Sequence, residues 1–271
     1  MLNFLYYGNF FEYKDVLKQN GYTGQDYMGI GQFIFLGVAI VAIILLSIFL
    51  RKINHKKIDI FLKVLAIVIP LLEITKICVE TYSDIQYGHG FNESGLLPLY
   101  TCSLFIYTLP IAAFGTGKAR ECCLSFITTL GIFAGLTNFV MAPILQNYPF
   151  FNFHTFVSLN FHFWMVFTGV FLISSKYYIP SWIDILKGFA PAAILSIFVI
   201  PMDYICGWDY MLYYRGWGTP PFISDLANNL AAQGLRWVYT LIIIIGYHAI
   251  IAIIVGIVQL VIFLKNKFKK A

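Results

Sequence analysis

Charged residues are scarce in this chain of 271 residues: they make up 11% of it, whereas hydrophobic residues make up 59% and aromatic residues 18%. A soluble domain carries roughly 25% charged residues. The composition therefore excludes an ordinary soluble domain. It predicts an all-α integral membrane protein that crosses the cell membrane several times, because helices satisfy their own backbone groups in lipid.

Several site types are missing as well. The five cysteines show no CxxC spacing and do not form an even set, so zinc-finger and thioredoxin-like sites are excluded. Cys78 and Cys206 are both expected near the outer face, and whether they pair stays open. No basic patch with interleaved aromatics is present for nucleic acid. We expect no metal site, no cofactor and no nucleic-acid partner, and the sequence does not set the oligomeric state.

Long apolar runs dominate what is present. About seven of them approach the roughly 20 residues with which a helix crosses a bilayer. They lie at about 31–50, 59–81, 96–114, 122–145, 154–175, 183–205 and 234–264. We therefore expect a polytopic bundle of about seven transmembrane helices, in a single domain over residues 31–271.

Basic residues predict the orientation of the bundle, because loops rich in Lys and Arg stay cytoplasmic. They follow alternate spans and close the chain: Arg51, Lys52, Lys56, Lys57, Lys118, Arg120, Lys176, Lys187, Lys265, Lys267, Lys269 and Lys270. The N-terminus is thus predicted outside and the C-terminus in the cytoplasm. The net charge of +5 is concentrated on the inner side, which favours contact with anionic lipid headgroups.

Two further segments are predicted at the outer surface. Residues 1–30 are expected to form an amphipathic segment whose interfacial side chains are Phe4, Tyr7, Phe11 and Leu17. Residues 206–233 contain aromatics, a Gly-Pro-Pro sequence and scattered polar residues, which favours a folded cap loop over a site.

Four polar residues from different spans are predicted at one depth. With a rise of about 1.5 Å per residue, Cys102 lies on the order of 10 Å below the outer end of its span. His162 and Glu73 lie at about 12 Å and Asn138 at about 9 Å by the same count. Since polar groups are costly in lipid, we expect them to face the bundle interior.

Polar residues also share helix faces. The fifth span carries a stripe with the spacing i, i+4, i+8, formed by His154, Ser158 and His162. The second span carries ionisable residues at i, i+3, i+7, so that a lysine can neutralise carboxylates on both sides: Glu73, Lys76 and Glu80. The residues of this second stripe either form an ion-pair ladder that holds helices together or include a carboxylate that orients a histidine.

The remaining polar candidates are open to two interpretations. Asn138 forms an interhelical hydrogen bond or supports a site. Asp203, near the outer end of the sixth span, binds either the cap loop or a substrate headgroup. Gly131 and Gly135 are four residues apart, which predicts the close approach of a neighbouring helix.

Cys102 and His162 suggest chemistry because they are expected at matching depth. A buried cysteine alone usually packs as a small hydrophobe. An imidazole within hydrogen-bond reach takes the thiol proton, and the thiolate is a strong nucleophile for acyl carbonyls. A lipid-accessible Cys and His pair therefore suggests acyl transfer through a thioester.

Four stretches, LLPLYTCSL, GIFAGLTNFVMAPIL, HTFVSLNFH and DYMLYY, resemble in this order the blocks of the transmembrane protein 164 acyltransferase family, whose bacterial members are the YwaF-like proteins. The similarity runs from roughly Glu73 to the end of the cap loop. It implies a seven-helix acyltransferase of membrane lipids that moves a fatty acyl chain between a phospholipid and a lysophospholipid. It also implies that Cys102 is the nucleophile and His162 the base, although His154 lies on the same stripe.

The mechanism we expect has two steps: His162 deprotonates Cys102, the thiolate attacks a phospholipid ester, and the chain then passes to a lysolipid or to water. Asn138 and Ser158 are the candidate oxyanion donors by depth. A lipid ester hydrolase is the first alternative. A transporter that uses the ladder of the second span as a proton path is the other.

Overall fold

The computed structural model describes residues 8–24, 29–89, 97–216, 219 and 221–268. Within these ranges the chain is helical and contains no β-strand, which confirms the all-α class. The elements are α1 (Lys14–Gln19), α2 (Ile30–Leu50), α3 (His55–Gln86), α5 (Leu104–Phe114), α6 (Gly117–Thr128), α7 (Leu130–Met141), η1 (Pro143–Gln146), α8 (Phe153–Ser174), α9 (Asp184–Lys187), α10 (Ala190–Cys206), η2 (Tyr210–Leu212), α11 (Pro221–Ala232) and α12 (Arg236–Phe268).

Five helical stretches of the described chain are long and apolar enough to cross a membrane. They are α2, α6 through η1, α8, α9 with α10, and α12, which correspond to five of the seven predicted spans. The predicted spans 59–81 and 96–114 fall on α3 and α5. α3 has 32 residues but carries charges along its apolar run, and α5 has only 11 residues. Seven crossings and the orientation of the termini stay predictions.

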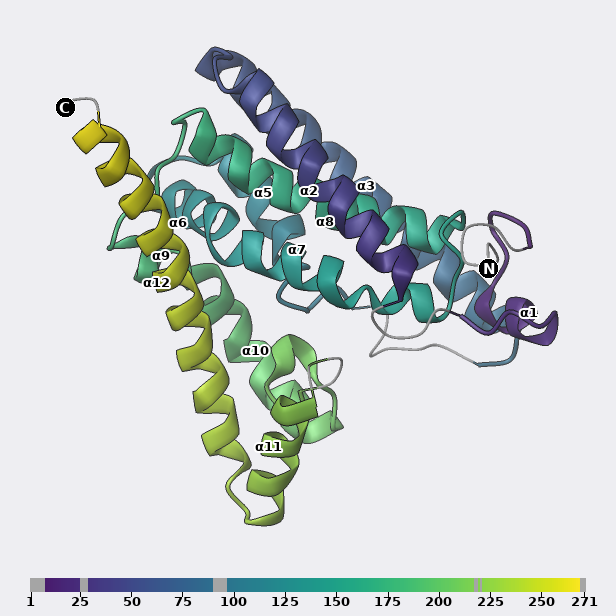
Figure 1. Cartoon of the computed structure of the whole chain (residues 1–271). Helices are drawn as coiled ribbons and strands as arrows, with labels where there is room; N and C mark the ends of the chain where they lie inside the picture. Colours follow the sequence, from purple (N-terminus) through teal and green to yellow (C-terminus); the bar gives the residue numbers. More distant parts are fainter. Residues whose placement is uncertain (1–7, 25–28, 90–96, 217–218, 220, 269–271) are drawn as a thin grey trace.

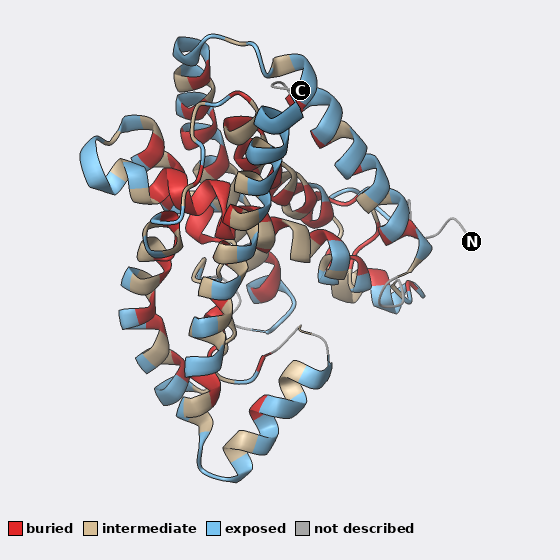
Figure 2. Cartoon of the chain, turned by 60° about the vertical axis from the view of Figure 1, so that its left-hand side comes forward, coloured by how far each residue is buried: buried red, intermediate tan, exposed pale blue. Residues whose placement is uncertain are grey.

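The helix α8 lies at the centre of one group of helices and packs against α2, α3, α6 and α7 (Figure 1). Of the residues in the most apolar stretch of α8, 61% are buried, against 17% in the corresponding stretches of α2 and of α12. Figure 2 shows buried residues in the middle of the molecule and exposed ones along the outer helices. α8 therefore provides an interior surface, while α2 and α12 present isoleucine, leucine and phenylalanine side chains outward, as helices that face lipid do.

The helices α9 to α12 form a second group that extends away from α2 and α8 (Figure 1). α12 packs on α7, α9 and α11, and α10 packs on α5 and α6. The predicted cap of residues 206–233 consists of η2 and α11 in its described part. Cys78 and Cys206 are both exposed free thiols in this structure.

The predicted span 122–145 is not one continuous helix. It divides at Thr129, whose φ of −129° and ψ of −95° separate α6 from α7. The hydroxyl of the preceding Thr128 donates to the Leu124 carbonyl at 2.8 Å. Thr128 is fully buried, and this hydrogen bond to the backbone of its own helix satisfies its hydroxyl next to the break.

The segment before α2 is fastened to the ends of α3 and α8. The Phe10 carbonyl accepts from the Phe153 amide at 2.7 Å, and the Tyr13 hydroxyl donates to the Asp84 carboxylate. Leu17 is fully buried against Tyr22 and Tyr148, so it packs on protein and does not face the predicted interface. Phe11 is exposed, as expected for an interfacial side chain. The predicted positions Phe4 and Tyr7 lie outside the described residues.

Glycines let α7 and α8 approach closely. A Cβ atom on Gly135 would lie 2.4 Å from Val166 Cγ2, which confirms the close approach that the sequence predicts there. A Cβ atom on Gly169 would lie 2.5 Å from the Ile127 carbonyl oxygen and 2.5 Å from Ile132 Cγ1. Because the Ile127 oxygen belongs to the backbone of α6 and cannot turn aside, Gly169 sets the closest approach of α8 to the end of α6.

We expect Gly169→Ala to lower the free energy of unfolding by about 1 to 3 kcal/mol, since the added methyl group overpacks a tight contact. The matched control is Gly37→Ala on α2, where a Cβ atom meets nothing within 4 Å. Thermal unfolding in detergent, followed by circular dichroism, should show a loss of stability for Gly169→Ala alone. Equal stability of the two variants would contradict the close contact.

Candidate functional site

A cavity of about 100 Å³ lies between α3, the segment before α5, and α8. Four residues predicted from the sequence line it: Glu73, Cys102, Ser158 and His162. The other lining residues are Lys76, Leu97, Pro98, Tyr100, Ser103 and Phe161. Three of the four polar groups that were predicted at one depth therefore meet in one place.

Cys102 lies in the turn that begins α5. Its carbonyl accepts from the Phe105 amide at 3.0 Å, and the first helical residue, Leu104, follows after Ser103. The first turn of a helix has backbone N–H groups without intrahelical partners and carries a partial positive charge. Cys102 thus lies directly before the N-terminus of α5, where this partial positive charge is found.

The turn with Cys102 is held by α12 and by the cap. Tyr247 lies 2.8 Å from the Thr101 hydroxyl and 2.7 Å from the Met211 carbonyl, measured between oxygens. Because a carbonyl only accepts, Tyr247 donates to Met211 and accepts the proton of Thr101. The ring of Tyr100 also contacts that of Tyr210 in the cap, with centroids 5.1 Å apart. These contacts restrain the residues on the N-terminal side of Cys102.

His162 has one satisfied and one unsatisfied ring nitrogen. Nδ1 lies 2.7 Å from the Ser158 carbonyl oxygen, and Nε2 is buried with no hydrogen-bond partner among the residues that the structure describes. Since the carbonyl cannot donate, the proton of the neutral ring lies on Nδ1 and the lone pair on Nε2. His162 thereby has the tautomer of a general base, and this residue lines the cavity that contains Cys102.

The cavity also contains an ion pair. The Lys76 ammonium lies 3.3 Å from the Glu73 carboxylate, and both side chains are largely buried. The sequence analysis placed Lys76 between two carboxylates in an ion-pair ladder. The structure shows its pair with Glu73 and also places Lys76 in the lining of the cavity that contains Cys102. A buried cation there offers electrostatic stabilisation to any negative charge that develops on a reacting group.

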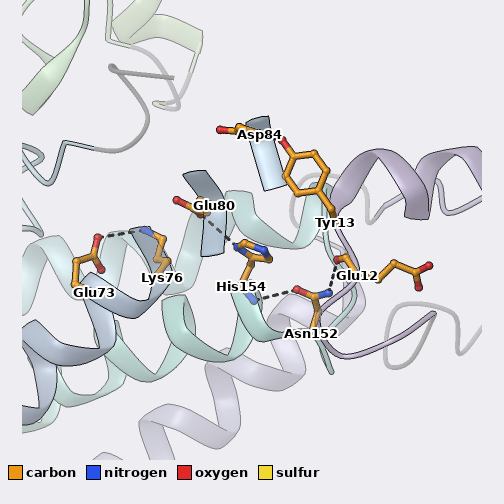
Figure 3. A network of polar contacts seen from close by, with 8 residues as sticks. All are labelled: Glu12, Tyr13, Glu73, Lys76, Glu80, Asp84, Asn152 and His154. Carbon is orange, nitrogen blue, oxygen red and sulfur yellow. Dashed lines mark hydrogen bonds and ion pairs between the residues drawn. The ribbon is translucent and has the colours of Figure 1, made fainter. Parts of the chain in front are cut away.

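A separate polar network lies farther along the same two helices, and Figure 3 shows it. The Glu80 carboxylate lies 3.4 Å from His154 Nδ1, so this pair joins α3 to α8. His154 stacks on the ring of Tyr148 with centroids 4.4 Å apart, and its amide donates to the Asn152 side chain at 3.0 Å. The two polar stripes therefore face each other, but His154 belongs to this network and does not line the cavity.

Two predicted residues lie away from the cavity. Asn138 on α7 has a buried side-chain oxygen with no hydrogen-bond partner in the described structure. Asp203 on α10 accepts from the Tyr210 amide at 2.9 Å, so it binds the cap, which is one of its two predicted roles. Depth along a helix does not fix which way a side chain points, and neither residue lines the cavity with Cys102.

Tyr247 is the main contributor that the sequence analysis missed. The available signal is a single hydroxyl inside the aliphatic stretch LIIIIGYHAIIAII, which in a bundle has to find a partner. Its neighbour His248 instead bonds the Ile244 carbonyl at 2.9 Å and contacts the ring of Phe189. Among the described residues, no group of three His, Cys, Asp or Glu side chains is arranged to hold a metal ion.

Comparison with known protein families matches residues 27–266 to the TMEM164 family. The match includes every residue that lines the cavity. Neither the curated proteins nor the solved structures contain a significant match to the chain. The family match covers far more than half of the sequence, and the helices α2, α8 and α12 have the length and composition of membrane spans. The chain therefore belongs to the TMEM164 family of membrane proteins.

Proposed function

We propose that this protein is an integral membrane lipid acyltransferase with Cys102 as nucleophile and His162 as general base. The observation that carries the proposal is the cavity that both residues line, together with the unpartnered Nε2 of His162. A nucleophile and its base need one shared space, and both residues line this cavity. The resemblance to acyltransferases in the blocks around Cys102 and His162 supports the same chemistry.

In the first step, His162 Nε2 takes the proton of the Cys102 thiol, and the thiolate attacks an ester carbonyl of a phospholipid. The carbonyl π electrons move to oxygen and form a tetrahedral intermediate. As the intermediate collapses, the ester C–O bond breaks and the alkoxide of the lysophospholipid leaves. It takes the proton from His162, and the acyl chain stays on Cys102 as a thioester.

The tetrahedral oxyanion needs donors. The backbone N–H groups of Ser103 and Leu104 follow Cys102 directly, whereas those of Phe105 and Ile106 already donate to the carbonyls of Cys102 and Ser103. The Lys76 ammonium lines the same cavity. Of the two donors predicted from depth, Ser158 lines this cavity and Asn138 does not. We therefore assign oxyanion stabilisation to the start of α5 and to Lys76, with Ser158 holding the imidazole through its carbonyl.

In the second step, the hydroxyl of a lysophospholipid gives its proton to His162 and attacks the thioester. The C–S bond breaks, and the Cys102 thiolate regains the proton from His162. Water in place of the lysophospholipid gives the hydrolase reaction through the same intermediate. The fate of the acyl chain, transferred to an added lysolipid or released as free fatty acid, separates these two activities.

Acyl chains are proposed to enter sideways from the bilayer. Leu97 and Tyr100 line the cavity and are 38% and 41% exposed, and Leu71 and Ile74 on α3 are exposed nearby in sequence to Glu73. Leu97 and Tyr100 thus give the cavity an exposed apolar edge that a lipid tail can contact. We also propose that the chain crosses the membrane seven times. In this topology α3 and α5 cross in addition to the five long apolar helices, and the N-terminus lies outside.

We expect a phospholipid donor to leave an acyl adduct on Cys102 that hydroxylamine removes, because a thioester is the proposed intermediate. Mass spectrometry of the purified protein after incubation with lipid measures it. Cys102→Ala should abolish both the adduct and acyl transfer, whereas Cys78→Ala and Cys206→Ala, which remove exposed thiols, should retain both. Full acyl transfer by Cys102→Ala would refute the thioester route.

His162→Ala should slow the acylation of Cys102 by about 10² to 10⁴-fold, the usual contribution of a general base. His248→Ala is the matched control. Its ring bonds the carbonyl four residues earlier in the same way, but it does not line the cavity. Single-turnover measurements with a labelled phospholipid should show the loss for His162→Ala only. Equal rates for the two variants would remove His162 from the mechanism.

A further inference from the structure

A second and larger cavity lies at the other end of α8 from Cys102. Its volume is about 530 Å³, and it is lined by the ends of α2, α8 and α12. Figure 1 shows these three helix ends at the same end of the molecule, close to the C-terminus. The proposed acyl chemistry makes no use of this cavity.

Among the described residues, no carboxylate lines the cavity, and four basic side chains do: Arg51, Lys52, Lys176 and Lys265. Within the described chain, none of the four forms an ion pair. Other basic residues near this end do have acidic partners, since Arg120 lies 3.3 Å from Asp59 and Lys187 lies 2.7 Å from Glu121. Cations grouped around one space without a carboxylate attract an anion.

The cavity also has one buried hydroxyl and an apolar wall. Ser47 is 4% exposed, and its hydroxyl is buried without a hydrogen-bond partner among the described residues. The hydroxyls of Ser174 and Ser175 already donate to the Phe171 carbonyl, at 3.1 and 2.7 Å, so Ser47 provides the available hydroxyl. Ile44 and Ile48 line the cavity and are each 50% exposed along the outer face of α2. The lining thus combines donors for an anion with a surface for a hydrocarbon chain.

Lys176 has a backbone conformation that suits glycine. It follows α8 with a φ of 58°, in the left-handed region. Its amide donates to the Ile173 carbonyl at 3.0 Å, and the Tyr177 amide donates to the Leu172 carbonyl at 3.0 Å, the pattern of a helix-ending Schellman motif. Glycine is the usual residue here because lysine has a conformational cost that glycine avoids. A lysine at this position is consistent with use of its ammonium group.

We propose that this cavity binds the negatively charged phosphate headgroup of a membrane lipid, with a hydrocarbon chain of the lipid along Ile44 and Ile48. The four cations surround the phosphate and the Ser47 hydroxyl donates to it. The exposed apolar wall favours a lipid over a soluble phosphate, because a soluble anion has no group to cover it. This site is independent of the proposed acyl transfer: it binds the phosphate headgroup of a lipid, whereas the cavity with Cys102 is proposed to bind an acyl ester.

The test uses the full-length protein in a neutral detergent, with phosphatidylglycerol and phosphatidylcholine of the same chains as probes. Native mass spectrometry measures how much of each lipid stays bound. The wild-type protein should retain phosphatidylglycerol at least fivefold more strongly than phosphatidylcholine, and added salt should weaken this retention. Lys176→Gly and Lys265→Gln should each weaken phosphatidylglycerol binding about fivefold.

Lys176→Gly separates binding from folding, because glycine fits the left-handed position and should keep or raise the thermal stability. Lys187→Gln is the matched control, since it removes the same charge outside the cavity and should bind as the wild type does. Unchanged phosphatidylglycerol binding by Lys176→Gly and Lys265→Gln would overturn the site. Equal wild-type binding of both lipids would also overturn it. A thermal shift with inorganic phosphate alone that is lost in the same variants would overturn the assignment to a lipid.

Discussion

The hydrogen bond from His162 Nδ1 to the Ser158 carbonyl, 2.7 Å long, is the interaction on which the site depends. A histidine inside an apolar bundle usually satisfies its ring or is replaced by a hydrophobic residue. Here a carbonyl of the same helix satisfies one nitrogen and fixes the proton there, while the other nitrogen stays buried and unpartnered. Without this bond the ring could turn or change tautomer, and the proposed base would no longer present a lone pair on Nε2.

Neighbouring helices pack against α8 on several sides and so hold His162 in position. Gly135 and Gly169 bring α7 and α8 together, while Glu80 and His154 join α3 to α8 about one turn beyond the cavity. Tyr247 holds the turn before α5 from the opposite side. The first half of α8 lines the cavity that contains Cys102, and its end lines the basic cavity. One rigid helix thus spans the region where ester chemistry is proposed and the region where an anionic headgroup is proposed.

Helical periodicity and depth along each helix predicted much of this arrangement. They could not predict the rotation of each helix or the contacts between distant segments. The 3.6-residue repeat placed Ser158 and His162 on one face of a helix. The length of an apolar run placed Cys102 at a similar depth, and all three residues line the cavity. Depth leaves the rotation of each helix undetermined, which is why Asn138 was grouped with them and lies elsewhere. The break at Thr129 depends on tertiary packing, and the partner of Tyr247 lies 146 residues away at Thr101. No local pattern encodes contacts at that separation.

The most direct test of the central claim is a cross-link between the positions of the thiol and the imidazole. In a variant that keeps Cys102, carries His162→Cys and has serine at the other four cysteine positions, a short bifunctional thiol reagent should join the two cysteines within one chain. The control is Asn160→Cys, which helical geometry places on a different face of α8 and which should not react in this way. Efficient linkage at His162→Cys alone is the predicted result. A folded protein that links neither position, or both equally, would contradict a shared cavity.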